Sequence, residues 1–346
     1  LSLDDRSSWR QMAGFGLLLG VVFWVRYDAI FLIAADAAVT VGMGGPRTRS
    51  RILGRAARMG VACAAAFLVA LPWLLYNWFE FGSIVPISGR AESLAADFGG
   101  NLSRIPVLLA QQLLAIWEIS TPGERSPLLG WLGALVVLLG VVFYARAWRS
   151  ASGPERRLMV LVALFGALLC GNYGLLFSAP YALKRYLFPL SPFLALGTCA
   201  GICHLLQDPG PRTRFAAVVF GGVLVGHLTL SNWNASRRGE SDPHWEKVAW
   251  IQEHVSPDEW VGSLQSGVVG FFHDRTLNLD GKVNPQALQA RRQGRIPGYV
   301  LRSDIEWLVD WPLILSLVTH PAIAEEFELK LRRRRLVVAR RREAPS

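Results

Sequence analysis

Arg26, Tyr27 and Asp28 are the first residues along the chain that could do chemistry, and they separate two apolar runs. Charged side chains beside a membrane core are costly unless they pair or face water, so such residues are candidates for function. A cation at an interrupted helix would suit the phosphate of a lipid. A plain interfacial Arg–Asp pair that ends two helices is the alternative.

A second group of basic and aromatic residues is Lys184, Arg185 and Tyr186, which precede another apolar run. Adjacent cations at the start of a helix could bind a phosphate or pyrophosphate, and a guanidinium offers two parallel hydrogen bonds. Ordinary anchors at a membrane interface would use the same residue types. Both interpretations stay open from the sequence.

Two further segments carry polar residues near glycine and proline. Glu80, Ser83 and Arg90 follow an apolar run and are candidates for substrate contact, although a loop anchored by aromatic residues would look similar. Asp280 and Asn284 are also candidates for substrate contact. The Asp-Gly and Asn-Pro pairs that contain them are equally typical of plain turns.

The elements that must position these residues are strongly apolar. The chain has 346 residues, of which 52% are hydrophobic and 18% charged, against about 25% charged in an average soluble protein. A bilayer core about 30 Å thick needs about 20 apolar residues per helix. We therefore predict a mainly α fold, a polytopic bundle of about seven spans or half-spans near 11–25, 28–43, 59–79, 128–145, 158–178, 187–206 and 214–231.

Arginines in the connections predict the orientation of this bundle, because Lys and Arg are retained in cytoplasmic loops. Residues 44–58 contain five arginines and no acid, and residues 145–157 are similarly basic, so we place both in the cytoplasm. Arg26 to Asp28, residues 178–186 and everything after Asn232 then lie outside. Arginines retained in cytoplasmic loops explain the net charge of +10 better than nucleic-acid binding does. We therefore expect the lipid bilayer as a partner and no nucleic acid.

Cysteines and carboxylates show no spacing typical of a metal site. All four cysteines lie within apolar runs, and no group of acids has the pattern of a cation site. We predict no cofactor, no metal, and a metal-independent reaction.

The chain divides into a transmembrane helical domain at 1–231 and a soluble α/β domain at 232–346, where helical and strand patterns alternate. We predict a helix from about 244, strand 260–264, a turn, strand 276–279, a helix from 284 and strand 306–309. A hairpin-like pair, 328–333 and 336–340, closes the domain.

Three segments together resemble bacterial GT-C glycosyltransferases, such as the dolichyl-phosphate-mannose–protein mannosyltransferase-like enzymes and the lipid A aminoarabinose transferase. They are Trp24-Val25-Arg26-Tyr27-Asp28, the stretch from Leu71-Pro72-Trp73 to Ser88, and Lys184-Arg185-Tyr186-Leu187-Phe188-Pro189. The tail from Trp250 to Tyr299 is similar to the extracytoplasmic domain of many such proteins.

The resemblance implies an enzyme in the cell membrane that moves a hexose or pentose from a polyprenyl-phosphate donor to an envelope glycan, lipid or protein outside the cytoplasm. Arg26, Lys184, Arg185 and Tyr186 would bind the donor phosphate, with Tyr27 and Asp28 near the substrate. We expect Arg26 and Arg185 to face one cavity at the outer membrane boundary.

The catalytic base is unknown, because the family places it in the first extracytoplasmic loop. This sequence opens at Leu1 without a Met, so we expect that loop, and with it the amino-terminal part of the enzyme, upstream of Leu1. Two other classes stay open. A transporter or lipid flippase also places charges at broken helices, and a non-catalytic envelope scaffold would use the tail to bind partners.

Overall fold

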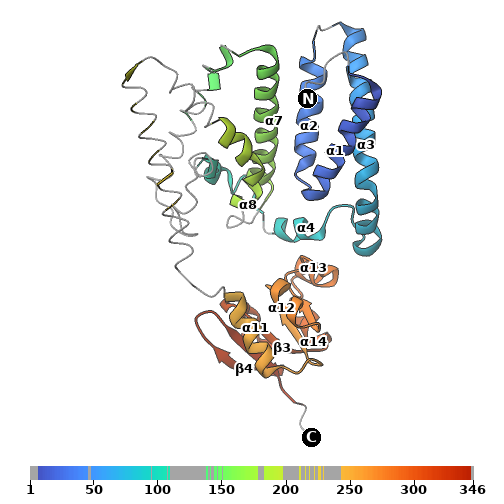
Figure 1. The fold of residues 1–346 in the computed structure, drawn as a ribbon. Helices are drawn as coiled ribbons and strands as arrows, with labels where there is room; N and C mark the ends of the chain where they lie inside the picture. The colour runs from blue at the N-terminus through green and yellow to red at the C-terminus, as the bar shows by residue number, and fades with distance from the viewer. Residues whose placement is uncertain are drawn as a thin grey trace. The chain divides into compact units, whose positions relative to one another are not determined.

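A computed structural model shows two compact units (Figure 1). One comprises Leu1–Tyr76 with Ala95–Arg237, and the other Asn77–Leu94 with Arg238–Ser346. Scattered positions are described between 138 and 149 and between 210 and 229. The continuous stretches that the structure describes are 7–45, 48–94, 96–106, 108–109, 151–177, 183–197 and 243–343.

Long apolar helices build the first unit: α1 (Trp9–Val25), α2 (Ala29–Met43), α3 (Arg49–Phe81) and α7 (Gly153–Leu175). Helix α1 begins with a capping box in which Ser8 accepts a hydrogen bond from the backbone of Gln11. Helix α7 begins with the same device, because the carboxylate of Glu155 accepts a hydrogen bond from the Ser152 backbone at 2.6 Å.

Helices α3 and α7 are long and apolar enough to cross a membrane. Only 28% of the apolar window of α3 and 22% of that of α7 are buried, whereas the core helix of a soluble protein would be mostly buried. Large apolar side chains such as Leu68 of α3 and Leu158 of α7 point outward. This pattern supports membrane association.

The prediction of about seven spans stays a prediction. Helices α1 and α2 match two of the expected segments, but at 1.5 Å per residue they extend only about 26 and 23 Å. Residues 128–145 and 214–231 lie mostly outside the described part of the chain. In the expected span 187–206, a 3-10 turn, η3 (Phe188–Leu190), leads into helix over 191–197, and the rest is outside.

Glycines bring α1 and α3 into close contact. Gly16 and Gly20 stand one turn apart on α1, and a Cβ at Gly16 would lie 2.1 Å from the backbone oxygen of Ala62. Ala62 and Ala66 on α3 are buried opposite them. Small residues spaced by four let two helices in lipid approach closely. Close packing is important there because lipid tails are as apolar as the side chains, so the hydrophobic effect does not drive the helices together.

A second contact joins α2 to α7 and to the short helix α8 (Leu183–Leu187), and Figure 1 shows α2 and α7 side by side. Phe165, Leu169 and Tyr173 of α7 pack with Ala35 of α2 and Leu187 in one buried cluster. The turn η1 (Leu102–Arg104) also lies against α7. This cluster holds α2, α7 and α8 together.

The second unit is a small α/β fold, as predicted. Its sheet has the order β2-β1-β3-β5-β4, in which β1 is parallel to β2 and β3, while β5 is antiparallel to β3 and β4. The strands are β1 (Trp260–Ser263), β2 (Thr276–Asn278), β3 (Ile305–Asp310), β4 (Phe327–Arg332) and β5 (Val337–Arg341).

Helices cover both faces of this sheet. On one face α11 (Pro243–His254) and α12 (Ser266–Phe272) pack on Val261, Trp307 and Val338. The second apolar cluster contains Leu308 and Val337, and four further helical segments contribute to it. These segments are α14 (Ile296–Arg302), the 3-10 turn η4 (Pro312–Ile314), α15 (Leu315–Val318) and α16 (Pro321–Glu326).

A segment from the middle of the chain completes this unit. Helix α4 (Ile87–Ser93) packs through Ile87 and Ala91 onto Leu288 of α13 (Pro285–Arg292). Glu92 forms an ion pair with Lys282 at 2.6 Å. The second unit therefore combines residues 77–94 with the tail.

Candidate functional site

The Arg26–Asp28 segment forms the break between α1 and α2. Arg26 is extended where α1 ends, and its guanidinium donates to Asp28 through Nε at 3.0 Å and through Nη2. The Asp28 side chain is buried, whereas that of Arg26 is 34% exposed. The pair therefore buries its acid and leaves part of its base accessible.

Two aromatic residues and the backbone of α8 complete this cluster. The Tyr173 hydroxyl of α7 donates to Asp28, and Arg26 Nη1 donates to the backbone oxygen of Arg185 at 3.3 Å. The Tyr186 ring stacks on Tyr173 with centroids 4.8 Å apart. Residues from α7, α8 and the α1–α2 break thus meet at one place.

The Arg185 side chain lies over its neighbour Tyr186. Its guanidinium carbon is 5.1 Å from the ring centroid, and Nη2 donates to the Tyr186 hydroxyl at 3.3 Å. Arg185 is exposed. A guanidinium has five N–H donors, and the hydrogen bonds among the described residues use one of those on Arg185 and three of those on Arg26. The cluster can therefore donate to an anion from two directions.

The remaining candidates near these helices have different surroundings. Tyr27 packs against Phe23 with ring centroids 4.9 Å apart, which is an anchoring role. Ser83 is buried and donates to the backbone oxygen of Val85 at 2.7 Å, so it holds the turn after α3. Lys184 belongs to α8, and its side chain lies outside the described part.

Glu80 and Arg90 are exposed, and both belong to the segment that packs with the C-terminal unit. Neither side chain is brought to the Arg26 cluster by any contact among the described residues. Their predicted role in substrate contact stays a prediction.

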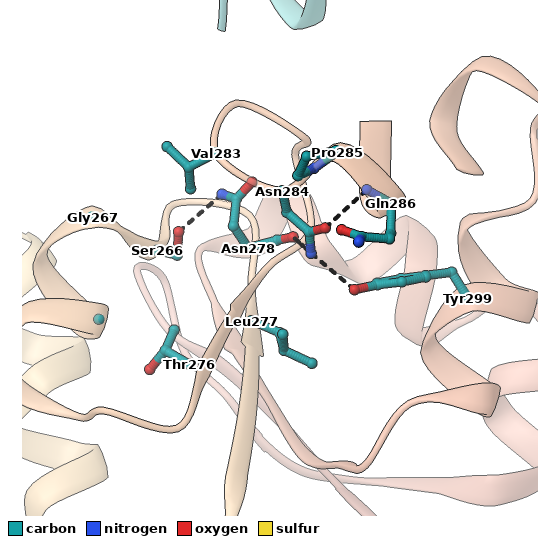
Figure 2. A pocket seen from close by; sticks show the side chains of 11 residues that line it. Ser266, Gly267, Thr276, Leu277, Asn278, Val283, Asn284, Pro285, Gln286 and Tyr299 are labelled. Carbon is teal, nitrogen blue, oxygen red and sulfur yellow. Dashed lines mark hydrogen bonds between the residues drawn. The ribbon is translucent and has the colours of Figure 1, made fainter. Parts of the chain in front are cut away.

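A second candidate site is a pocket of about 620 Å³ in the C-terminal unit (Figure 2). It opens where β1 and β2 end and α12 and α13 begin. Its lining residues carry no charge; they are Ser266, Gly267, Gly270, Thr276, Leu277, Asn278, Val283, Asn284, Pro285, Gln286 and Tyr299. Clefts of about 300–1,000 Å³ at the carboxyl ends of parallel strands are common ligand sites.

Asn284 shapes one wall of this pocket. Its oxygen accepts hydrogen bonds from the backbone of Gln286 and Ala287, which caps α13, and its nitrogen donates to the Tyr299 hydroxyl at 2.8 Å and to the backbone oxygen of Asn278. The Asn284 amide is thereby fully used within the protein, which favours the turn interpretation for this residue.

Asp280 also has a structural role. It is buried, its Oδ1 accepts from the Lys282 backbone at 2.9 Å, and its Oδ2 pairs with the Lys282 ammonium at 3.3 Å. Gly281 follows with φ of +78°, and a Cβ there would lie 2.7 Å from the Cα of Leu288. This turn therefore needs glycine, and Asp280 is outside the pocket lining.

A buried charged network lies at the carboxyl ends of β1 and β3, where the strand order reverses. The Lys247 ammonium of α11 donates to Asp310 at 3.0 Å, and the other Asp310 oxygen accepts from the Ser263 hydroxyl at 2.9 Å and the Gln265 backbone at 2.8 Å. Lys247 is fully buried. The network occupies the ends of β1 and β3, and the pocket, lined by Thr276, Leu277 and Asn278 of β2, lies beside it.

The sequence analysis missed Tyr173, the pocket and the Lys247–Asp310 network. Tyr173 could have been found from the sequence, because it lies near the end of a long apolar helix and a buried hydroxyl needs a hydrogen-bond partner. Lys247 lies in an ordinary mixed helix, and nothing in the sequence marks it as buried.

Comparisons with known proteins address the tail alone. Residues 232–341 match the family described as a domain of unknown function (DUF8728). None of the curated proteins matches the chain. The match covers most of the α/β unit and brings no activity with it.

Proposed function

We propose that this chain is part of a membrane glycosyltransferase that moves a sugar from a polyprenyl-phosphate donor to an envelope acceptor on the extracytoplasmic side. The resemblance of its ordered motifs to GT-C enzymes motivates this function. The observation that carries it is the hydrogen bond from Arg26 to the Arg185 backbone at 3.3 Å, which joins two motifs 159 residues apart.

The charge of the cluster supports a phosphate ligand. Asp28 neutralises Arg26, and Arg185 adds a positive charge whose guanidinium is exposed. In the proposed reaction the leaving group is a lipid phosphate, and cations beside it stabilise the negative charge that develops as the glycosidic bond breaks. Arg185 is the residue better placed to contact the phosphate, with Arg26 beside it.

The proposed topology places both arginine-rich connections, near Arg51 and Arg156, in the cytoplasm and the C-terminal unit outside. Single reporters, Arg51→Cys and Gln286→Cys, in a background lacking the four native cysteines test this arrangement. A membrane-impermeant maleimide applied to intact cells should label Gln286→Cys and leave Arg51→Cys unlabelled. Labelling of both from one side would exclude the topology.

Binding of the donor phosphate can be measured with polyprenyl phosphate on the purified full chain, by native mass spectrometry. We expect polyprenyl phosphate to bind and the uncharged polyprenol to bind at least tenfold more weakly. Arg185→Ala should weaken binding by about 10- to 100-fold, the equivalent of one or two charge-assisted hydrogen bonds. Arg51→Ala, an exposed arginine at the start of α3, serves as the matched control.

A double variant separates two roles for Arg26. Arg26→Ala leaves the buried Asp28 carboxylate without its cation, so it would repel a phosphate even if Arg26 never touched one. Arg26→Ala/Asp28→Ala removes this repulsion. If the double variant binds polyprenyl phosphate as wild type does, Arg26 only balances Asp28. If binding stays weak, Arg26 contacts the phosphate.

Turnover tests the reaction itself. The full-length gene product is incubated with polyprenyl-phosphate hexoses and pentoses, and released polyprenyl phosphate is measured. No release from any donor, with the lipid bound normally, would refute the transferase function and leave a lipid-binding role such as a flippase.

A further inference from the structure

Some polar groups in the wall of the uncharged pocket are already used in hydrogen bonds within the C-terminal unit. Other polar groups in the lining can still bond to a ligand. The amides of Asn278 and Asn284 hold the walls, because Asn278 Nδ2 donates to Ser266 Oγ at 2.9 Å and its Oδ1 accepts from the Gly281 backbone. Asn284 caps α13 and donates to Tyr299. Figure 2 shows these two amides close to each other among the lining residues.

Three other groups can serve a ligand. The hydroxyls of Ser266 and Tyr299 each accept a hydrogen bond from an asparagine, so each retains its own O–H to donate. The side-chain amide of Gln286 makes no hydrogen bond within the described residues, and it is exposed at the pocket. An amide supplies both a donor and an acceptor. The pocket therefore presents neutral donors and acceptors from three elements.

No side chain in the lining of this pocket is charged, although charged residues lie nearby. Asp280 pairs with Lys282, and Lys282 also pairs with Glu92 of α4. A phosphate or carboxylate ligand would meet no cation in the lining, and an ammonium would meet no acid. The lining offers no counter-charge to either kind of ligand, which favours a neutral ligand.

We propose that this pocket binds a neutral saccharide unit. Hydroxyl and amide groups match the hydroxyls of a sugar, and Tyr299 adds an apolar ring surface beside them. The choice of a saccharide among neutral ligands rests on the proposed function, in which the acceptor or a neighbouring part of it is a glycan. Binding does not depend on the transfer reaction, so the two proposals can fail separately.

Gly267 offers a way to fill the pocket without disturbing the fold. It lies in the first turn of α12, and nothing lies within 4 Å of a Cβ placed on it. Gly267→Phe should therefore occupy part of the pocket and block a ligand. Ala324→Phe places the same side chain on an exposed position of α16, away from the pocket, and is the matched control.

The test is saturation-transfer NMR and calorimetry on the purified full chain with neutral di- and trisaccharides of glucose, mannose, galactose and arabinose. Glucose 6-phosphate and glucosamine serve as charged probes. We expect at least one neutral saccharide to bind, Gly267→Phe to abolish its signal, and Ala324→Phe to retain it. Tyr299→Phe, which removes one neutral hydrogen bond, should weaken binding by about 3- to 10-fold.

The proposal is wrong if no neutral saccharide binds, if the charged probes bind as tightly, or if Gly267→Phe binds like wild type. Circular dichroism and urea unfolding of each variant check that the α/β unit is intact. Should Gly267→Phe unfold, Gln286→Ala replaces it, because that exposed side chain makes no hydrogen bond in the described structure. Saccharide binding that survives alanine at Arg185 would show that this pocket is independent of the phosphate cluster.

Discussion

The Lys247–Asp310 pair allows a stability prediction that can be worked from the contacts. The Asp310 carboxylate accepts four hydrogen bonds, from the Lys247 ammonium, the Ser263 hydroxyl and the backbone nitrogens of Gln265 and Trp311. Asp310→Ala takes the acceptor away from all four donors, of which the Lys247 ammonium is charged and fully buried. Removing one partner of a buried ion pair costs about 3–5 kcal/mol, and we expect the upper end of that range.

Lys247→Met should cost less, about 3 kcal/mol, because three donors continue to satisfy the carboxylate. In Lys247→Met/Asp310→Ala both charges are gone, so the double variant should be more stable than the sum of the single effects by about 1–3 kcal/mol. Gln265 directly precedes Ser266 of the pocket, so Asp310→Ala should also weaken saccharide binding.

Pulse proteolysis across a urea series, read from a carboxyl-terminal tag on the purified full chain, measures the stability of this unit. Glu306→Ala, an acid on β3 that is not fully buried, is the control and should change stability by less than about 1 kcal/mol. Additive single effects, or a loss below about 1 kcal/mol for Asp310→Ala, would refute the conclusion that this pair stabilises the α/β unit.

Three more changes test the packing. Gly16→Leu should lower the thermal stability of the detergent-solubilised chain, because its Cβ would overlap the α3 backbone, whereas Gly14→Leu meets open space and should be neutral. In urea pulse proteolysis, Gly281→Ala should cost more than Gly294→Ala; both have positive φ, but only Gly281 also faces a backbone clash. A tail expressed without Asn77–Leu94 should fold yet be less stable than the same unit in the full chain, since its contact with α4 is missing.

Local patterns predicted most of the α/β unit. Runs of strand-forming residues bounded by turn residues predicted each strand within two residues at either end, and Asn284 before Pro285 marked the start of α13 correctly. Helix α12 was wrongly expected to be a turn, because Gly267 and Gly270 weaken a helical pattern in so short a segment. Packing of Val269 against the sheet outweighs that low propensity.

The sequence predicts which distant residues lie on the same side of the protein only where membrane spans can be counted from the arginine-rich loops. Charge asymmetry in the loops predicts Arg26 and Arg185 on one side of a membrane, and this topology stays a prediction. The structure shows that Arg26 donates a hydrogen bond to the Arg185 backbone. No comparable rule connects residues 77–94 to α13. Ile87 and Ala91 are ordinary apolar residues, and their partner Leu288 lies about 200 residues further on.

Polar residues resist prediction when their role depends on burial. Asn284 and Asp280 were proposed as substrate contacts because they are polar and close to glycine or proline, yet their side chains are occupied by capping and turn bonds. Gln286, exposed at the same pocket, has a side chain without an internal hydrogen bond in the described structure. An amide already satisfied by the backbone has little left to offer a ligand, so the residues that shape this pocket and the residues that would bind its occupant are different ones.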